Sequence, residues 1–171
     1  AQRCDLITIS HYHFDHYTPT WRSIEAKWTW SSYSEAKEIY GGRLVCAKDI
    51  RNLINPCQRR RGYIFGKIAS DFAKELRYVD STTIQFNNTR VVFSPPVPHG
   101  ENGTPLGYLL IVTIEEEGFK FMYCPDVQGP TSTSTLQYIL DSSPNMVVIG
   151  GPPLYLSGLK VQPEALATGL E

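Results

Sequence analysis

The sequence lacks the features that mark several large classes of proteins. Its longest apolar stretches, such as residues 108–114, fall far below the roughly 18 residues that a membrane-spanning helix needs. Neither sign of charge is in excess: 16 Lys and Arg face 17 Asp and Glu, a net charge of −1, which argues against a dedicated nucleic-acid-binding protein. The four cysteines are widely spaced without a CxxC pair, so free thiols are expected and not a disulfide framework. No secretory or transit signal is recognisable, and we expect a cytoplasmic protein that does not contact the membrane.

The composition that remains is that of a globular domain. Hydrophobic residues make up 42% of the 171 residues and aromatic residues 12%, which is enough to build a core. The length corresponds to about one domain, which we expect to span residues 1–171. Because the chain begins without Met and closes in a helical pattern, we expect it to be an internal segment of a longer polypeptide.

Short apolar runs separated by turn residues predict more strand than helix. The expected strands are 6–10, 44–47, 82–86, 91–93, 108–114, 119–123 and 146–149. The expected helices are 32–41, opened by a capping box at Ser32 and Glu35, then 64–76, 131–140 and 162–170. Turn residues at 87–88 and 115–118 predict two hairpins. The pattern therefore indicates an α+β chain dominated by hairpins.

Three of the four histidines fall within six residues. His11, His13, Asp15 and His16 form the pattern HxHxDH directly after the predicted strand 6–10. At this chain's composition, the expected number of chance matches is roughly one in ten thousand. Neutral imidazole and carboxylate groups suit zinc, iron or manganese, so the loop is a candidate site for one ion or for two. The competing interpretation is a polar network of partly buried histidines.

This motif resembles the signature of the metallo-β-lactamase superfamily, and the rest of the chain agrees in order and rough spacing. His99 in the stretch PVPHG is similar to the superfamily's next ligand histidine, and Asp126 in YCPDVQG to its metal-bridging aspartate. Together with SHYHFDHYTP, these stretches are closest to an uncharacterised, mainly archaeal branch. The resemblance implies a four-layer αββα sandwich that begins with a β-hairpin layer before the HxHxDH strand and has a last ligand histidine after the bridging aspartate. Here only ten residues precede His11 and no histidine follows Asp126, so we expect the sandwich to be incomplete at both ends.

The resemblance also implies a set of metal ligands. His11, His13 and His99 would bind the first of two divalent ions, and Asp15, His16 and Asp126 the second. Zinc is the expected metal, with iron or manganese as alternatives. Asp15 has a second candidate role, as the catalytic general base towards water if only one metal binds.

A dinuclear site of this kind predicts a hydrolase that activates water, acting on an ester, thioester, phosphodiester or lactam in a small-molecule substrate. The alternatives are an iron-dependent oxidoreductase on the same scaffold, a nuclease, and a non-catalytic relative that only binds metal. The net charge and the absence of an inserted domain argue against nucleic acid as a partner.

Other residues have both a functional and a structural interpretation. Cys124 shares a strand face with Asp126, yet burial in the core is the commoner fate of cysteine. The run 59–61, three arginines, would steer a phosphate-bearing substrate or lie on a solvated loop, the latter being favoured. Five aromatic residues near the motif suit a pocket wall and a core equally: Tyr12, Tyr17, Trp21, Trp28 and Trp30.

Overall fold

The computed structural model describes residues 4–20, 32–154, 164 and 167. Its chain divides into two compact units, Ala1–Val79 (unit 1) and Asp80–Glu171 (unit 2). The three tryptophans lie outside the described residues, as does most of the expected helix 162–170. The two described residues of that segment, Glu164 and Ala167, are helical.

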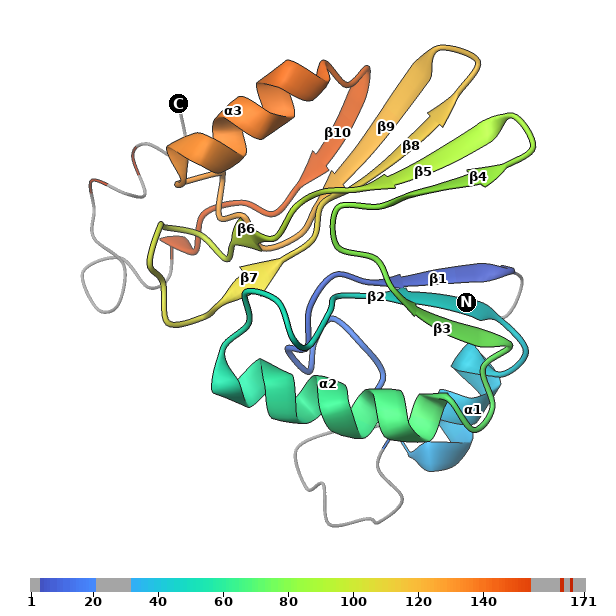
Figure 1. The fold of residues 1–171 in the computed structure, drawn as a ribbon. Coiled ribbons are helices and arrows are strands. Elements are labelled where there is room, and N and C mark those ends of the chain that lie inside the picture. The colour runs from blue at the N-terminus through green and yellow to red at the C-terminus, as the bar shows by residue number, and fades with distance from the viewer. Residues whose placement is uncertain (1–3, 21–31, 155–163, 165–166, 168–171) are drawn as a thin grey trace. The chain divides into compact units, whose positions relative to one another are not determined.

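Unit 1 is built on a parallel sheet. Its strands β1 (Leu6–Ile9), β2 (Leu44–Ala47) and β3 (Glu75–Tyr78) pair in the order β1-β2-β3, with their first residues in register. The helices α1 (Tyr33–Tyr40) and α2 (Pro56–Ala69) connect successive strands and lie on the same face of the sheet (Figure 1). This is the arrangement expected for successive right-handed crossovers.

Local sequence signals explain where both helices begin. The Ser32 side chain accepts a hydrogen bond from Glu35 N, and the Glu35 carboxylate accepts one from Ser32 N, which confirms the predicted capping box. At α2, the Asn55 side chain accepts from the Gln58 N–H, and Pro56 follows at the first helical position, where its missing N–H costs nothing.

The predicted helix 64–76 is wrong in extent. The helix starts earlier, at the Asn55 cap, and ends at Ala69, after which Ala73 N donates to Ala69 O in a turn. Leu76, assigned to that helix from a spacing of four residues, lies in β3, where exposed and half-buried residues alternate as in a strand. The arginine run 59–61 is therefore helical and does not lie on a loop.

The core of unit 1 lies between its sheet and its helices. Tyr12 and Tyr17 belong to it, so their structural interpretation is confirmed. Its buried members are Ile9, Tyr12, Tyr17, Ala36, Tyr40, Val45, Ala47, Ile54, Phe65 and Ala69.

Unit 2 is made mostly of hairpins. Its elements are β4 (Thr83–Phe86), β5 (Thr89–Phe93), β6 (Val97–Pro98), β7 (Tyr108–Leu109), β8 (Val112–Glu116), β9 (Phe119–Cys124), α3 (Thr133–Ser142) and β10 (Met146–Ile149). Five strands pair in the order β10-β9-β8-β5-β4, antiparallel except for β10 on β9, and β6 pairs with β7 separately. The predicted strand 108–114 is thus two strands in two different sheets.

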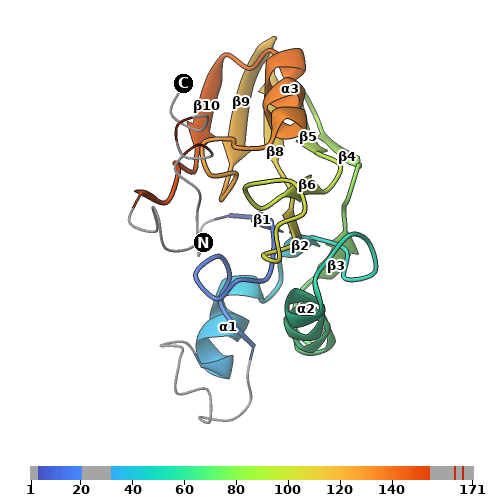
Figure 2. The same ribbon diagram turned by 90° about the vertical axis from the view of Figure 1, so that its left-hand side faces the viewer.

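Helix α3 connects β9 to the parallel strand β10 and packs against the sheet (Figure 2). Ile139 of α3 belongs to a buried cluster with Met122 and Cys124 of β9. All four side chains of β10, an outer strand among those described, are exposed.

The chain is therefore an α/β structure, with three helices and mixed sheets among its described residues. The hairpin-dominated prediction describes unit 2, whereas unit 1 is parallel. No helix in the described part of the chain has the length and apolar character to cross a membrane.

Candidate metal centre

The HxHxDH loop leaves the carboxyl end of β1, where open α/β sheets commonly place ligand-binding residues. His11 is fully buried, and His13 and His16 are partly buried. The ring centroid of His11 lies 4.7 Å from that of His13 and 4.4 Å from that of His16. The loop thus brings three imidazoles into one cluster within unit 1.

The orientation of His11 is set by the residue before it. The Ser10 hydroxyl lies 3.0 Å from His11 Nδ1, and both residues are buried. In the tautomer in which Nδ1–H donates a hydrogen bond to this hydroxyl, Nε2 is the nitrogen whose lone pair can bind a metal.

Gln58 of α2 contacts the loop at two points. Its side-chain oxygen accepts a hydrogen bond from Tyr12 N at 3.2 Å, and its amide nitrogen lies 3.3 Å from His13 Nε2. The glutamine is fully buried. Sequence reasoning missed this residue, because nothing in the sequence links it to the distant HxHxDH motif.

Other groups of unit 1 restrain the backbone of the same loop. Arg61 donates to Tyr12 O at 3.3 Å, and its guanidinium carbon lies 3.9 Å from the ring centroid of Phe14. The Tyr12 hydroxyl donates to Lys48 O at 2.7 Å. A Cβ at Gly62 would lie 2.5 Å from the Tyr12 ring, so α2 approaches the loop as closely as a glycine permits. The loop is therefore fixed on both sides of His13.

Asp15 and His16 differ from the two preceding histidines in exposure. The Asp15 side chain is 78% exposed, and its Oδ2 lies 3.5 Å from His16 Nε2, whose side chain is 19% exposed. The Asp15 carboxylate is thus open to solvent next to a ring of the histidine cluster.

Unit 2 holds the other two candidate ligands as a pair. His99 Nε2 lies 2.9 Å from Asp126 Oδ2, with His99 buried and Asp126 half-buried. His99 directly follows β6, and its N–H donates to Gly107 O at 2.9 Å. The next residue, Gly100, has a φ of +87°, and a Cβ there would lie 2.4 Å from the Gln128 side chain. A side chain at position 100 would therefore disturb the segment that carries His99.

The backbone of Asp126 is supported by the end of β10. Asp126 has a φ of +46°, a left-handed conformation that aspartate tolerates better than most residues. Gly150 N donates to Cys124 O at 2.9 Å, and a Cβ on Gly150 would lie 2.7 Å from Asp126 N. Gly150, the residue after β10, is thus a close backbone neighbour of a candidate ligand.

Cys124 is fully buried in the apolar cluster of unit 2, and burial raises the pKa of its thiol to about 12. A neutral, buried thiol is a core residue. The structural interpretation of this cysteine therefore fits the structure better than a thiolate ligand.

The chain thus offers two groups of metal-binding side chains. His11 and His13 in unit 1, and His99 and Asp126 in unit 2, each present a ligand atom of a type that binds zinc or iron. His/Asp residues that could hold metal are therefore present.

No protein-family model matches the chain. It is 40% identical over 156 residues to a UPF0282 protein of Methanocaldococcus jannaschii, covering 91% of this chain and 52% of that protein. It is 36% identical over 157 residues to a UPF0282 protein of Pyrococcus horikoshii, covering 92% of this chain and 50% of that protein. The chain thus spans about half the length of the curated relatives it matches.

Two solved structures are similar in fold. An isothiocyanate hydrolase from Delia radicum gut bacteria aligns with a TM-score of 0.54 at 13% identity, over 85% of this chain and 49% of that one. A variant of the CmlA beta-hydroxylase aligns with a TM-score of 0.51 at 15% identity, over 86% of this chain and 26% of that one. Both have the metallo-β-lactamase fold, so the fold implied by the motif resemblance is confirmed. The chain is similar in sequence to archaeal UPF0282 proteins and in fold to metallo-β-lactamase-fold structures.

Proposed function

We propose that this chain carries the metal site of a metal-dependent hydrolase. The proposed ligands of the first divalent ion are His11, His13 and His99, and those of the second are Asp15, His16 and Asp126. The donor set fits zinc, since it consists only of imidazole nitrogens and carboxylate oxygens. We further propose that the two units, as parts of one domain, contribute the layers of a four-layer αββα sandwich.

The observation that carries the proposal is the imidazole cluster. The ring centroids of His13 and His16 lie 4.7 and 4.4 Å from that of His11, so the three rings would repel one another if protonated together. A divalent metal ion turns the same crowding into a favourable arrangement, because neutral imidazoles donate lone pairs to it. The loop is also held from α2 and from the backbone of Lys48, which is the support a metal site needs.

Zinc, when bound, supplies Lewis acidity and lowers the pKa of a bound water from 15.7 towards about 7. The chain's own residues supply the rest. Ser10 and Gln58 orient His11 and His13, which keeps the donor atoms in place. Asp15 is the residue best exposed to exchange a proton with solvent or substrate, because its carboxylate is open and lies beside His16. Its assigned role is ligand of the second ion, and its alternative role is proton acceptor if one ion binds.

The fold alone does not choose the reaction. The two similar structures are named as a hydrolase and as a hydroxylase, so the same architecture occurs with different chemistries. We favour hydrolysis because the proposed ligands are imidazoles and carboxylates that suit zinc, and iron bound by the same ligands would make an oxidoreductase the alternative. The substrate we propose is a small molecule, with nucleic acid disfavoured by the net charge of −1.

Metal content per chain tests the proposal. The full-length protein, purified without chelator, is compared by elemental analysis with His13→Ala, Asp126→Asn and the control Asp141→Asn, which alters an exposed aspartate on α3. We expect about two equivalents of zinc in the wild type and the control, and a loss of about one or both in the two ligand variants.

The same preparations are then assayed on phosphodiester, thioester, ester and lactam substrates. Hydrolysis that follows the zinc content would support the proposed reaction. Wild-type protein that binds no metal would refute the site. About one equivalent of iron with a visible absorption band would replace the hydrolase with the oxidoreductase.

A further inference from the structure

A hollow of about 580 Å³ lies on the surface of unit 1, a size suited to a small molecule. It is formed between the loop that follows β2 and the first two turns of α2. Its lining residues are Ile50, Arg51, Pro56, Arg59, Arg60 and Tyr63. Three of these six residues are arginines and none is acidic, so the lining favours an anion over a cation.

The loop after β2, which forms one side of the hollow, is held in place by a buried lysine. Lys48 is fully buried, and its ammonium group donates to Asp49 O at 3.0 Å and to Asn52 O at 2.5 Å. Two carbonyls of the loop therefore converge on one cation. This holds the short segment 49–52 in a defined shape before any ligand arrives.

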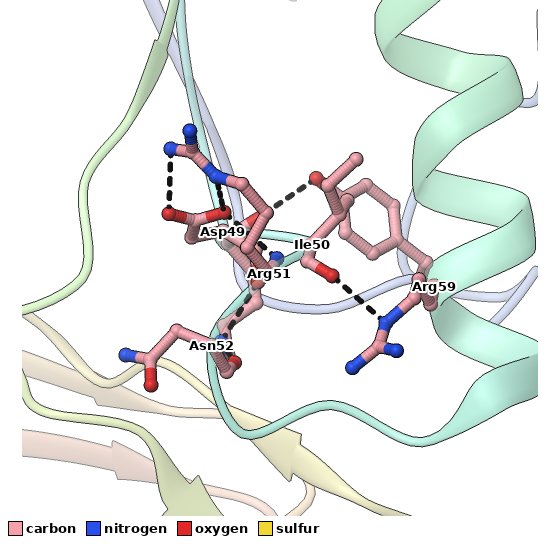
Figure 3. Close-up of polar contacts among 7 residues, drawn as sticks. Asp49, Ile50, Arg51, Asn52 and Arg59 are labelled. Carbon is pink, nitrogen blue, oxygen red and sulfur yellow. Dashed lines mark hydrogen bonds and ion pairs between the residues drawn. The ribbon is translucent and has the colours of Figure 1, made fainter.

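Arg51 is neutralised within this loop. Its Nε and Nη2 each lie 2.9 Å from a different oxygen of Asp49, and its backbone N–H donates to the same carboxylate at 2.8 Å (Figure 3). Its guanidinium also lies 5.6 Å from the ring centroid of Tyr78. Arg51 thus shapes the wall but adds little net charge to the hollow.

Arg59 and Arg60 supply the net charge. Arg59 Nε donates to Ile50 O at 3.1 Å, which anchors the guanidinium against the loop and directs its two terminal nitrogens away from that bond (Figure 3). Arg60 is exposed on the next position of the helix. With Arg51 paired to Asp49, the hollow carries about two positive charges, which match the charge of a phosphate monoester near neutral pH.

The remaining walls are apolar and partly flat. Tyr63 is 60% exposed and lies four residues after Arg59, so the two side chains share one face of α2. Ile50 and Pro56 complete that surface. An exposed tyrosine ring beside two arginines favours a ligand that joins a dianionic group to a planar one.

We propose that this hollow binds the phosphate monoester of a small molecule that carries an aromatic ring. In the proposed complex, the terminal nitrogens of Arg59 and Arg60 donate to phosphate oxygens, and the ring of the ligand packs on Tyr63. The site does not depend on the proposed metal centre. The third arginine of the run 59–61 does not contribute to the hollow, because Arg61 contacts Tyr12 and Phe14 on the other side of α2.

The probe is phenylphosphonate, a non-hydrolysable dianion at about pH 8. Its binding to the full-length protein is measured by calorimetry, beside benzoate and inorganic phosphate. We expect phenylphosphonate to bind more tightly than either. Arg59→Gln and Arg60→Gln should each weaken it by about ten-fold or more. Lys67→Gln, which removes the same charge from an exposed site in the last turn of α2, should leave binding unchanged.

Further comparisons distinguish this site from other modes of binding. In His13→Ala, binding should persist; its loss would mean that a metal held the phosphonate, and the proposal would be overturned. Benzoate binding as tightly as phenylphosphonate would overturn the assignment of a dianion. An oligonucleotide binding more tightly than phenylphosphonate would replace the small molecule with a nucleic acid. Equal binding by Arg59→Gln and Lys67→Gln would refute the site itself.

Discussion

Replacing Gln58 tests whether α2 positions the metal-ligand loop. Gln58→Met keeps the length of the side chain but removes both of its polar contacts, with Tyr12 N and with His13 Nε2. Tyr12 is fully buried, so its N–H would lose an acceptor out of reach of water. An unsatisfied buried donor costs about 1–3 kcal/mol, and the contact with His13 adds about 1 kcal/mol. We therefore expect the free energy of unfolding to fall by about 2–4 kcal/mol.

The effect on metal affinity is separable from this loss of stability. Partners that orient metal-ligating histidines change affinity by about 10- to 100-fold when removed, and the Gln58→Met protein should bind zinc that much more weakly. Gln58→Glu distinguishes the two contacts. It keeps an acceptor for the Tyr12 N–H and offers the His13 ring a carboxylate, so its zinc affinity should fall far less than that of Gln58→Met.

Zinc affinity is measured by competition with a chelator of known affinity, and stability by urea unfolding of the metal-free protein. The matched control is Gln137→Met, which makes the same change at an exposed position of α3. Gln58→Met that is less stable than the control but binds zinc with wild-type affinity would refute the positioning role. It would leave Gln58 as a structural residue only.

Three further outcomes follow from single positions. Gly150→Ala should lower the free energy of unfolding by about 1–3 kcal/mol, because its Cβ would meet a backbone nitrogen at 2.7 Å. Gly151→Ala should leave the free energy of unfolding unchanged, because a Cβ there meets nothing within 4 Å. Equal losses of stability in the two variants, measured by urea unfolding, would contradict the steric reasoning. Ser32→Ala should cost about 1 kcal/mol through loss of the capping box, measured in the same way. Burial raises the pKa of Cys46 from 9.0 to about 11, so the folded state keeps the thiol proton up to a higher pH than the unfolded chain does. Stability should therefore fall as the pH rises from 9 to 11, and Cys46→Ala should show a shallower decline.

The parts of the fold that the sequence predicts are those set by neighbouring residues. The capping box needs only Ser32 and Glu35. The turn residues at 87–88 and 115–118 suffice to predict two hairpins, although 115–116 pair in β8 and only 117–118 form the second turn. The strands 44–47 and 146–149 have the predicted bounds, because each is an apolar run closed by polar or glycine residues. Where local patterns conflict, prediction fails. Leu76 continues a helical spacing, yet it pairs in β3 because the helix has already ended at Ala69.

The same division applies to the candidate site. The candidate ligands of the first loop are visible in the sequence, since a dense HxHxDH pattern is rare by chance, whereas His99 and Asp126 are indicated only by the family resemblance. The residues that position the ligands cannot be recognised in the sequence. Gln58, Lys48 and Gly150 become neighbours of the ligand-bearing segments only through tertiary contacts. A buried glutamine or lysine has no pattern of its own. Such residues are recognised only when their partners are known.

The arginine run shows how secondary structure assigns roles that composition cannot. In the sequence, positions 59–61 are one basic run, interpreted either as steering a phosphate-bearing substrate or, by preference, as part of a solvated loop. On a helix, successive side chains are separated by about 100°, so Arg59 and Arg60 can line one hollow while Arg61, about 200° from Arg59, faces other neighbours. Arg61 packs on Phe14 and bonds to Tyr12 O, whereas Arg59 bonds to Ile50 O beside the hollow. Removing the charge at position 61 should therefore disturb the histidine loop, whereas removing it at position 59 should weaken binding of the proposed anion and remove the hydrogen bond to Ile50 O.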